Sequence, residues 1–187
     1  DVYDNPAGNY HVAIAGTGCG QVLAIDARTG EPLWRFPMSD GGVNHTVVTD
    51  GKVVIAGHNV ENLDSTVTGR LTAIDLAGPT ETASEGAPVL KAERWRLDVA
   101  AFSSSPVLHE GLVYQVTPTA ELVAIDVATG KVLWRTRLGQ DQLHASPVIA
   151  DGKLWIPLPD GAFFLVKAGR EGGQVLHTAR FPGKILG

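Results

Sequence analysis

The sequence contains one cysteine, Cys19, among its 187 residues. A single thiol excludes an intrachain disulfide, and there is no CxxC pair to bind a metal or attach a haem. Free cysteine is among the most often buried residue types, so we expect Cys19 to be a small buried side chain in its glycine-rich turn.

Long apolar runs and basic runs are also lacking. No stretch approaches the roughly 18 apolar residues that cross a bilayer as a helix, and the N-terminal residues lack the layout of a signal peptide. Fifteen basic residues stand against 20 acidic ones, giving a net charge of −5. Nucleic acid is therefore not an expected partner. The chain opens at Asp1 rather than at Met, which leaves room for a leader or further domains before it.

Motifs of catalytic sites are missing from the sequence as well. It has no nucleophile elbow, no phosphate-binding glycine loop and no HExxH motif, and its six histidines are scattered. The acidic stretch ENLDS, residues 61–65, offers Glu61, Asn62, Asp64 and Ser65 as oxygen ligands for a hard cation. Because their spacing does not match the EF-hand pattern, we favour a solvated loop and expect neither a metal site nor a catalytic site.

What the sequence does contain is a repeat. The stretch AIDARTGEPLWR, residues 24–35, returns as AIDVATGKVLWR, residues 124–135. Asp-Gly or Glu-Gly pairs recur as well, and Gly111 and Gly152 are 41 residues apart. A period near 40 residues is typical of propeller blades or of helical arrays.

The residue types decide between these two architectures. Each copy consists of short runs of Val, Ile, Leu, Phe, Tyr and Trp separated by Asp-Gly, Thr-Gly or Pro, as strands and turns are. In KVLWRTRL, residues 131–138, the side chains alternate at the two-residue period of a strand, so that one face of the strand is more polar than the other. Each copy predicts four strands, the last carrying the tryptophan. The predicted fold is all-β, a β-propeller of four-stranded antiparallel blades.

The second copy is longer than the later ones, because Gly51 and Gly111 are 60 residues apart. The additional residues fall in GHNVENLDSTVT, residues 57–68, and in AGPTETASEGAP, residues 77–88. We expect both insertions to be loops at exposed hairpin ends, where repeat proteins tolerate variation and often place a binding surface.

The pattern A-x-D-x-x-T-G-x-x-x-W occurs twice and resembles the tryptophan-docking motif of PQQ-like β-propellers. Asp can accept hydrogen bonds from the following turn, Gly can take a positive φ, and Trp offers a flat surface to the neighbouring blade. The fourth copy has Lys167 and His177 in place of Asp and Trp. The predicted blade-docking residues are Ala24, Asp26, Thr29, Gly30, Trp34, Asp75, Trp95, Ala124, Asp126, Thr129, Gly130 and Trp134.

Over nearly its whole length the sequence is similar to bacterial PQQ-binding-like, or BamB-like, repeat proteins. This resemblance implies a non-catalytic scaffold of the bacterial cell envelope, periplasmic or secreted, that binds protein partners or a small ligand and needs no cofactor. Two alternatives remain open. One is a fragment of a PQQ-dependent dehydrogenase, which by resemblance would hold PQQ with calcium, although no residue matches that site. The other is the extracytoplasmic sensor propeller of a larger receptor or kinase.

We predict a single partial propeller domain over residues 1–187, with approximate blades at 1–40, 41–99, 100–140 and 141–187. The first copy is expected to be incomplete and to lack its first strand. Four blades are fewer than the seven or eight that the family closes into a ring. The chain is therefore expected to be part of a longer protein, or to form a homodimer through its open blade edges.

Polar residues recur where the first strand of a blade begins. By family resemblance this strand starts at the rim of the central channel, so its polar groups can either recognise a ligand or merely line a water-filled channel. The candidates are Asn44, His45, Ser104, His144 and Ser146.

Overall fold

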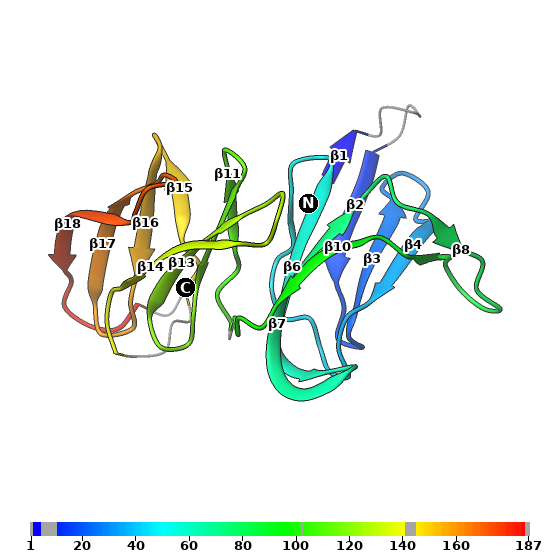
Figure 1. The fold of residues 1–187 in the computed structure, drawn as a ribbon, viewed down its shortest axis with the longest axis horizontal. Coiled ribbons are helices and arrows are strands. Elements are labelled where there is room, and N and C mark those ends of the chain that lie inside the picture. The colour runs from blue at the N-terminus through cyan, green and yellow to red at the C-terminus, as the bar shows by residue number, and fades with distance from the viewer. Residues whose placement is uncertain (1, 5–10, 102, 141–144, 186–187) are drawn as a thin grey trace. The chain divides into compact units, whose positions relative to one another are not determined.

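The computed structural model describes residues 2–4, 11–101, 103–140 and 145–185. Every regular element within these ranges is a β-strand, and the strands form four sheets (Figure 1). The residues group into two compact units, Asp1–Asp98 and Val99–Gly187, each with two sheets.

The third sheet shows the repeat in its simplest form. It consists of β11 (Val107–His109), β12 (Leu112–Val116), β13 (Glu121–Asp126) and β14 (Val132–Arg137), antiparallel and in chain order. The turn between β11 and β12 is Glu110-Gly111, and both residues have positive φ, 47° and 73°. The Asp-Gly and Glu-Gly pairs therefore mark the tight turns that the sequence predicted.

The fourth sheet repeats this plan in β15 (Val148–Ala150), β16 (Lys153–Pro157), β17 (Ala162–Lys167) and β18 (Gln174–Arg180). One hydrophobic core joins the two sheets of this unit. Leu112, Tyr114 and Leu122 lie in it together with Leu154 and Ile156.

The first sheet corrects one prediction. It contains β1 (Val2–Asp4), β2 (His11–Gly16), β3 (Gln21–Asp26) and β4 (Pro32–Pro37). Because β1 pairs with β2, the first copy has the first strand that it was expected to lack.

The second sheet contains β5 (Val48–Thr49), β6 (Val53–Asn62), β7 (Ser65–Asp75) and β10 (Glu93–Leu97), in the order β10-β7-β6-β5. The first insertion lies at a hairpin end, as expected, but it is not only a loop, because it lengthens β6 and β7 into one extended hairpin (Figure 1).

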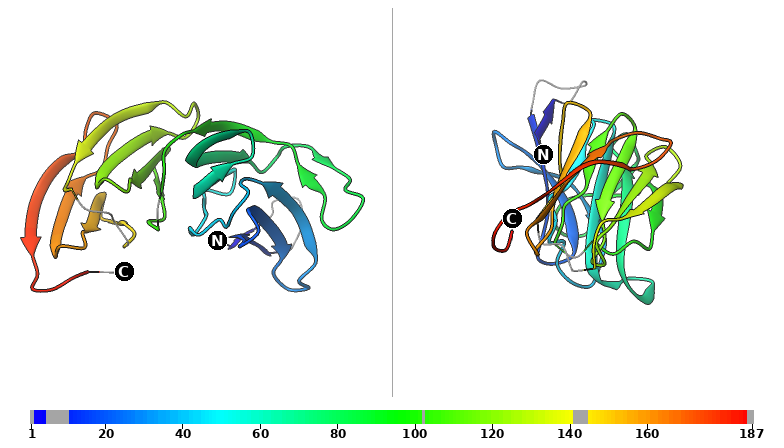
Figure 2. Two further views of the ribbon diagram at one scale, coloured as in Figure 1. Left: turned by 90° about the horizontal axis from the view of Figure 1, so that it is seen from below. Right: turned by 90° about the vertical axis from the view of Figure 1, so that its left-hand side faces the viewer.

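The second insertion is not a plain loop either. It forms a short hairpin of β8 (Thr80–Glu81) and β9 (Val89–Leu90). β9 pairs in parallel with β4 through Arg35 and Val89, so the first sheet has six strands. Figure 2 shows this hairpin, drawn in green, beside the blue strands of the first sheet.

The core of the first unit lies between its two sheets. Ile14, Ala24 and Trp34 from the first sheet pack with Val54 and Ile74 from the second. The predicted fold class, all-β with four-stranded antiparallel sheets, is confirmed by these strand orders. The assignment of residues 1–187 to one propeller domain stays a prediction.

Candidate interaction sites

The repeated Asp-x-x-Thr-Gly segment forms a closed turn in both of its copies. Asp26 Oδ1 accepts hydrogen bonds from the backbone N–H groups of Arg28 at 2.8 Å and Thr29 at 3.1 Å. These donors favour the ionised carboxylate and hold the pKa of Asp26 below its usual value. Gly30 closes the turn with a φ of 77°, a conformation that glycine adopts without steric cost. The aspartate therefore accepts hydrogen bonds within its own turn, and the glycine allows that turn to close.

Trp134 joins the third and fourth sheets. Its Nε1 donates a hydrogen bond to the Gly169 carbonyl at 2.9 Å, and its ring lies 6.0 Å from that of Tyr114. A Cβ on Gly173 would stand 2.5 Å from the Trp134 ring, so the indole occupies the space that a side chain there would need.

An ion pair lies at the same junction. Arg170, in the loop after β17, pairs with the carboxylate of Asp126, and Thr129 donates its hydroxyl to that carboxylate at 2.9 Å. The hydrogen bond from Arg170 is the main reason that the pKa of Asp126 is lowered. The loop 168–173 is therefore held by an indole donor and by a carboxylate of the preceding sheet.

The second copy, which lacks Thr-Gly, uses a different turn. Asp75 Oδ1 accepts from the Ala77 N–H at 3.2 Å, and Asp75 Oδ2 pairs with Arg94 at 2.7 Å. Trp34 and Trp95 are both buried. The aspartate is thus engaged even where the Thr-Gly pair is missing.

The predicted rim residues differ in exposure. Asn44 is exposed, whereas His45 is buried with its Nδ1 2.7 Å from the Gly57 carbonyl oxygen. Ser104 is buried, and its hydroxyl has no hydrogen-bond partner among the described residues. Ser146 is exposed and accepts a hydrogen bond from the Ser105 N–H at 3.0 Å. The structure therefore brings the Ser104 and Ser146 segments together, while His144 lies outside the described residues.

Charged side chains form a network around the β6–β7 hairpin, and one of them, Asp64, belongs to the stretch that the sequence analysis assigned to a loop. Arg70 is mostly buried and donates to Asp64 at 2.7 Å and to Asp98 at 3.1 Å. Arg96 pairs with Asp64 as well, and with Glu93 at 2.6 Å. The hydrogen bond from Arg70 lowers the pKa of Asp64, which is ionised between two guanidinium groups.

This network contradicts the cation hypothesis for ENLDS. The Asp64 carboxylate is paired with arginine side chains, and the Asn62 amide donates a hydrogen bond to the Val67 carbonyl at 2.6 Å. Across the described ranges, no group of three or more His, Cys, Asp and Glu side chains is arranged to hold a metal ion. The expectation for Cys19 was also wrong, because its side chain is exposed beside the Thr17 hydroxyl.

Beyond the network, the hairpin presents two apolar side chains to solvent. Leu63 is 52 % exposed and Val67 48 %. Leu63 also lines a pocket of about 170 Å³ together with Met38, Asp64, Arg70 and Arg96. Sequence reasoning placed a binding surface in this insertion but missed the strands, although the alternation of polar and β-branched residues in STVT is a strand signal.

His58 lies deeper in β6 and is fully buried. Within the part of the chain that is described, neither ring nitrogen has a hydrogen-bond partner of good geometry. Burial disfavours the charged imidazolium and lowers the pKa of His58, and the nearby charges of Arg70 and His45 act in the same direction. The neighbouring backbone of Val60 raises the pKa of His58 and offsets only part of this lowering.

Four sheets of mainly antiparallel strands that follow one another along the chain are typical of a β-propeller repeat protein. The family model described as outer membrane protein assembly factor BamB matches residues 4–80 and 90–180, and the chain belongs to this family. The unmatched residues 81–89 fall on the β8–β9 hairpin, so this hairpin stands outside the family pattern.

Three relatives and two solved structures are similar to this chain. It is 32 % identical over 122 residues to the serine/threonine-protein kinase AfsK of Streptomyces griseus, covering 62 % of this chain and 13 % of the kinase. It is 23 % identical over 149 residues to BamB of Escherichia coli K12 and of Shigella dysenteriae, covering 79 % of this chain and 32 % of each of them. The chain therefore spans a third or less of these relatives.

The structural likenesses concern the fold alone. The crystal structure of BamB from Moraxella catarrhalis aligns with a TM-score of 0.64 at 17 % identity, over 96 % of this chain and 47 % of that one. The computationally designed Ika8 protein aligns with a TM-score of 0.69 at 11 % identity, over 93 % and 48 %. No helix in the described ranges is long and apolar enough to cross a membrane.

Proposed function

We propose that this chain is a non-catalytic protein-binding scaffold of the bacterial cell envelope, located in the periplasm. The observation that carries the proposal is the β6–β7 hairpin, in which Leu63 and Val67 are exposed beside the ion pairs of Asp64 with Arg70 and Arg96. Membership of the BamB family, named after an outer membrane protein assembly factor, supports the location and the kind of partner.

The physical basis is preorganisation of the hairpin. The Arg70 side chain ties Asp64, next to the tip, to Asp98 at the end of the unit. A partner that covers Leu63 and Val67 therefore has little backbone to order, so less of the interaction energy is lost on binding. The apolar tip within a charged rim has the composition of a small protein-binding surface.

The test is site-specific photocrosslinking in the bacterium that makes the protein. A photoreactive residue at position 63 should crosslink to one envelope protein, whereas one at Val148, which is exposed on the fourth sheet, should not crosslink to that protein. With the crosslinked protein purified, the double change Leu63→Asp and Val67→Asp should weaken binding by at least tenfold, about 1.4 kcal/mol. Equal affinity of the double variant and the wild type would refute the proposed surface.

A second candidate function is supported by the kinase relative. Because 122 residues of this chain match a part of AfsK, the propeller can also be the ligand-reading module of a larger receptor. The intact mass of the native protein separates the two proposals. A mass far above 19.7 kDa, with a kinase domain in the additional residues, would establish the sensor and displace the scaffold.

We also propose that the repeated residues fasten neighbouring sheets, as the motif predicted. Trp134 supports this role through its hydrogen bond to Gly169 and its packing at Gly173. Trp34 is the corresponding residue of the first sheet, and it is buried against the second. The rim residues stay a prediction.

A further inference from the structure

A histidine closes one end of the core between the first and second sheets. Val54 and Ala56 of β6 belong to this core, and His58 follows them on the same face of the strand, because alternate side chains point to one side. The ring of His58 is fully buried, and neither of its nitrogens has a hydrogen-bond partner among the described residues. Such a site accepts the neutral imidazole far more readily than the imidazolium.

The side chains around His58 offer no negative charge to a protonated ring. On β7, Arg70 is paired directly opposite His58, and its side chain is only 10 % exposed. Ahead of β5, His45 is buried with its Nδ1 2.7 Å from the carbonyl oxygen of Gly57, the residue before His58. The carboxylates of the neighbouring segments are all exposed, and they are Asp40, Glu61, Asp64 and Asp98. A proton on His58 therefore adds a positive charge beside the Arg70 guanidinium, in a place that water does not reach.

The pairing of β6 with β7 becomes irregular at the same point. From Val53 to His58 the ladder is regular, and beyond His58 the register shifts twice before the turn. On the opposite strand Gly69, next to Arg70, has a φ of 82°, a conformation outside the strand region. Residues 59–69, here called the outer hairpin, are thus joined to the regular sheet through a hinge at His58 and Arg70.

Polar contacts hold the outer hairpin to the rest of the first unit. Arg70 donates to Asp64 in the outer hairpin and to Asp98 after β10, and both carboxylates are about half exposed. Asn62 forms an isolated bridge with Ser39. Exposed ion pairs contribute little to stability, because water replaces them readily. A segment held in this way can open locally at a lower free energy than the core of the unit.

We propose that His58 is a pH switch for the outer hairpin, which stays docked while the imidazole is neutral and opens about the His58–Arg70 hinge when the ring is protonated. Opening brings the imidazolium into water and away from Arg70. The inference rests on the proposed function, because the outer hairpin carries Leu63 and Val67. Acid thus lowers the fraction of chains that present this surface in its docked position.

The direction of the effect follows from the two states of the hairpin. Burial and the charges of Arg70 and His45 lower the pKa of His58 in the docked state, whereas the open state has the ordinary value of about 6.5. Opening therefore becomes more favourable as the pH falls below about 6.5. At pH 5 the gain reaches at most about 30-fold, when docked His58 is still neutral. Asp64 keeps its charge in this interval, because the hydrogen bond from Arg70 holds its pKa below the ordinary 3.8.

Hydrogen exchange of the free chain at pH 7 and pH 5, corrected for the intrinsic exchange rates, tests the switch. The hydrogen-bonded amides of the outer hairpin should be about 3- to 30-fold less protected at pH 5. The amides of β3, in the first sheet, should keep their protection, which separates opening of the hairpin from unfolding of the unit. Equal protection of the wild-type outer hairpin at both pH values would overturn the proposal, whatever the variants do.

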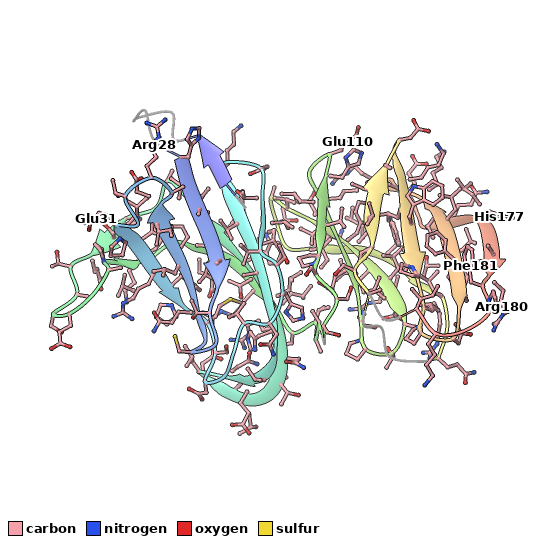
Figure 3. The ribbon with its side chains drawn as sticks, turned by 180° about the vertical axis from the view of Figure 1, so that it is seen from behind. Arg28, Glu31, Glu110, His177, Arg180 and Phe181 are labelled. Atoms are coloured by element: carbon pink, nitrogen blue, oxygen red, sulfur yellow. The ribbon has the colours of Figure 1, made fainter. Side chains whose placement is uncertain are left out.

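Two variants identify the group that takes up the proton. His58→Leu should have the same protection at pH 7 and pH 5, because leucine cannot be protonated. His45→Asn retains a donor near the Gly57 carbonyl and should keep the pH response. A response that persists in His58→Leu, or that is lost only in His45→Asn, would assign the proton to another residue and overturn the proposal. His177→Gln, at a histidine exposed on β18 (Figure 3), is the control and should behave like the wild type.

The exchange experiment needs no partner, so the switch and the proposed function can fail separately. With the crosslinked partner purified, its affinity for the wild type should fall at pH 5 in proportion to the fraction of opened chains. The affinity for His58→Leu reports any titration of the partner itself. Opening without this loss of affinity would refute the surface at Leu63 and Val67 and leave the switch in place, whereas unchanged protection would refute the switch alone.

Discussion

At the scale of single residues, His58 is the least well compensated polar group of the first unit. Its ring is fully buried, and no hydrogen bond of good geometry reaches it from the described residues. A buried polar group without a partner costs about 1–3 kcal/mol. Sequence reasoning could not anticipate this buried ring, because His58 belongs to an insertion that was expected to be an exposed loop.

Replacing His58 with leucine should leave the protein at least as stable at pH 7 and more stable than the wild type at pH 5. The folded state lowers the pKa of His58, so the unfolded chain takes up the proton first. The stability contributed by the neutral ring is complete above the unfolded pKa, about 6.5, and is lost as the pH falls toward the folded value. Urea unfolding at pH 5, 6 and 7 measures the difference.

The control for this prediction is His177→Gln, a change at an exposed histidine of the fourth sheet. Its stability should follow the pH dependence of the wild type. If the His58→Leu variant also kept the wild-type slope between pH 5 and 7, the buried imidazole would not be the group responsible.

At the scale of elements, the loop 168–173 of the fourth sheet contacts the third sheet through Trp134 and Thr136. Trp134 lies over Gly173, and Thr136 donates its hydroxyl to the Gly173 carbonyl at 3.3 Å. The sequence predicted the tryptophan as a docking residue but could not locate its partner. The loop has no motif of its own, and its position depends on a contact between sheets.

Gly173→Ala should destabilise the protein by about 1–3 kcal/mol, the usual cost of forcing an additional methyl group into a packed site. The new Cβ would lie 2.5 Å from a Trp134 ring atom. Gly172→Ala is a matched control in the same loop, because a Cβ there meets nothing within 4 Å. Chemical denaturation of both variants measures the effect. Equal stability of the two would refute the docking role of Trp134.

The extended hairpin shows the limit of reading elements from sequence. Its turn residues and its charges predicted a loop, and the chain indeed reverses there, between Asn62 and Ser65. What lengthens the strands is cross-strand pairing, such as that of His58 with Arg70, together with the ion pairs at the base. Such pairs depend on partners distant in sequence, so periodicity within the insertion could not show them.

At the scale of the whole molecule, carboxylates with lowered pKa values are distributed over both units. Asp26, Asp64 and Asp75 lie in the first unit and Asp126 and Asp151 in the second. Each stabilises the folded state fully above the unfolded pKa, about 3.9, and progressively less as the pH falls through its folded value. Acid should therefore weaken both units.

Asp126→Asn should lower the free energy of unfolding at pH 7 but make it less dependent on pH below about 4. The variant loses the ion pair with Arg170, and with it one of the groups that acid would neutralise. Guanidinium unfolding at pH 7 and pH 3 measures both values, and the difference between the two proteins should be smaller at pH 3 than at pH 7. Glu171→Gln, at an exposed loop carboxylate, should parallel the wild type. A constant difference between Asp126→Asn and the wild type at both pH values would contradict this account.

The general architecture could be predicted because the repeated segments contain local sequence signals for strands and turns. Turn glycines such as Gly111 and alternating strands recur along the chain, and an Ile-Asp strand end occurs in three of the four copies, so a weak signal in one copy is supported by the others. The first strand, Val2–Asp4, was missed because three residues are too few to show a period. The added pair β8–β9 was missed because it belongs to a different sheet from its neighbours in sequence.

That crossing has a consequence for the order of folding. β10, the outer strand of the second sheet, follows β8 and β9 in the chain, and these pair with the first sheet. The last strand of the second sheet therefore follows, along the chain, two strands that pair with the first sheet. Repeats can often fold and unfold one at a time. The first and second sheets, by contrast, must be completed together as the chain emerges from the ribosome.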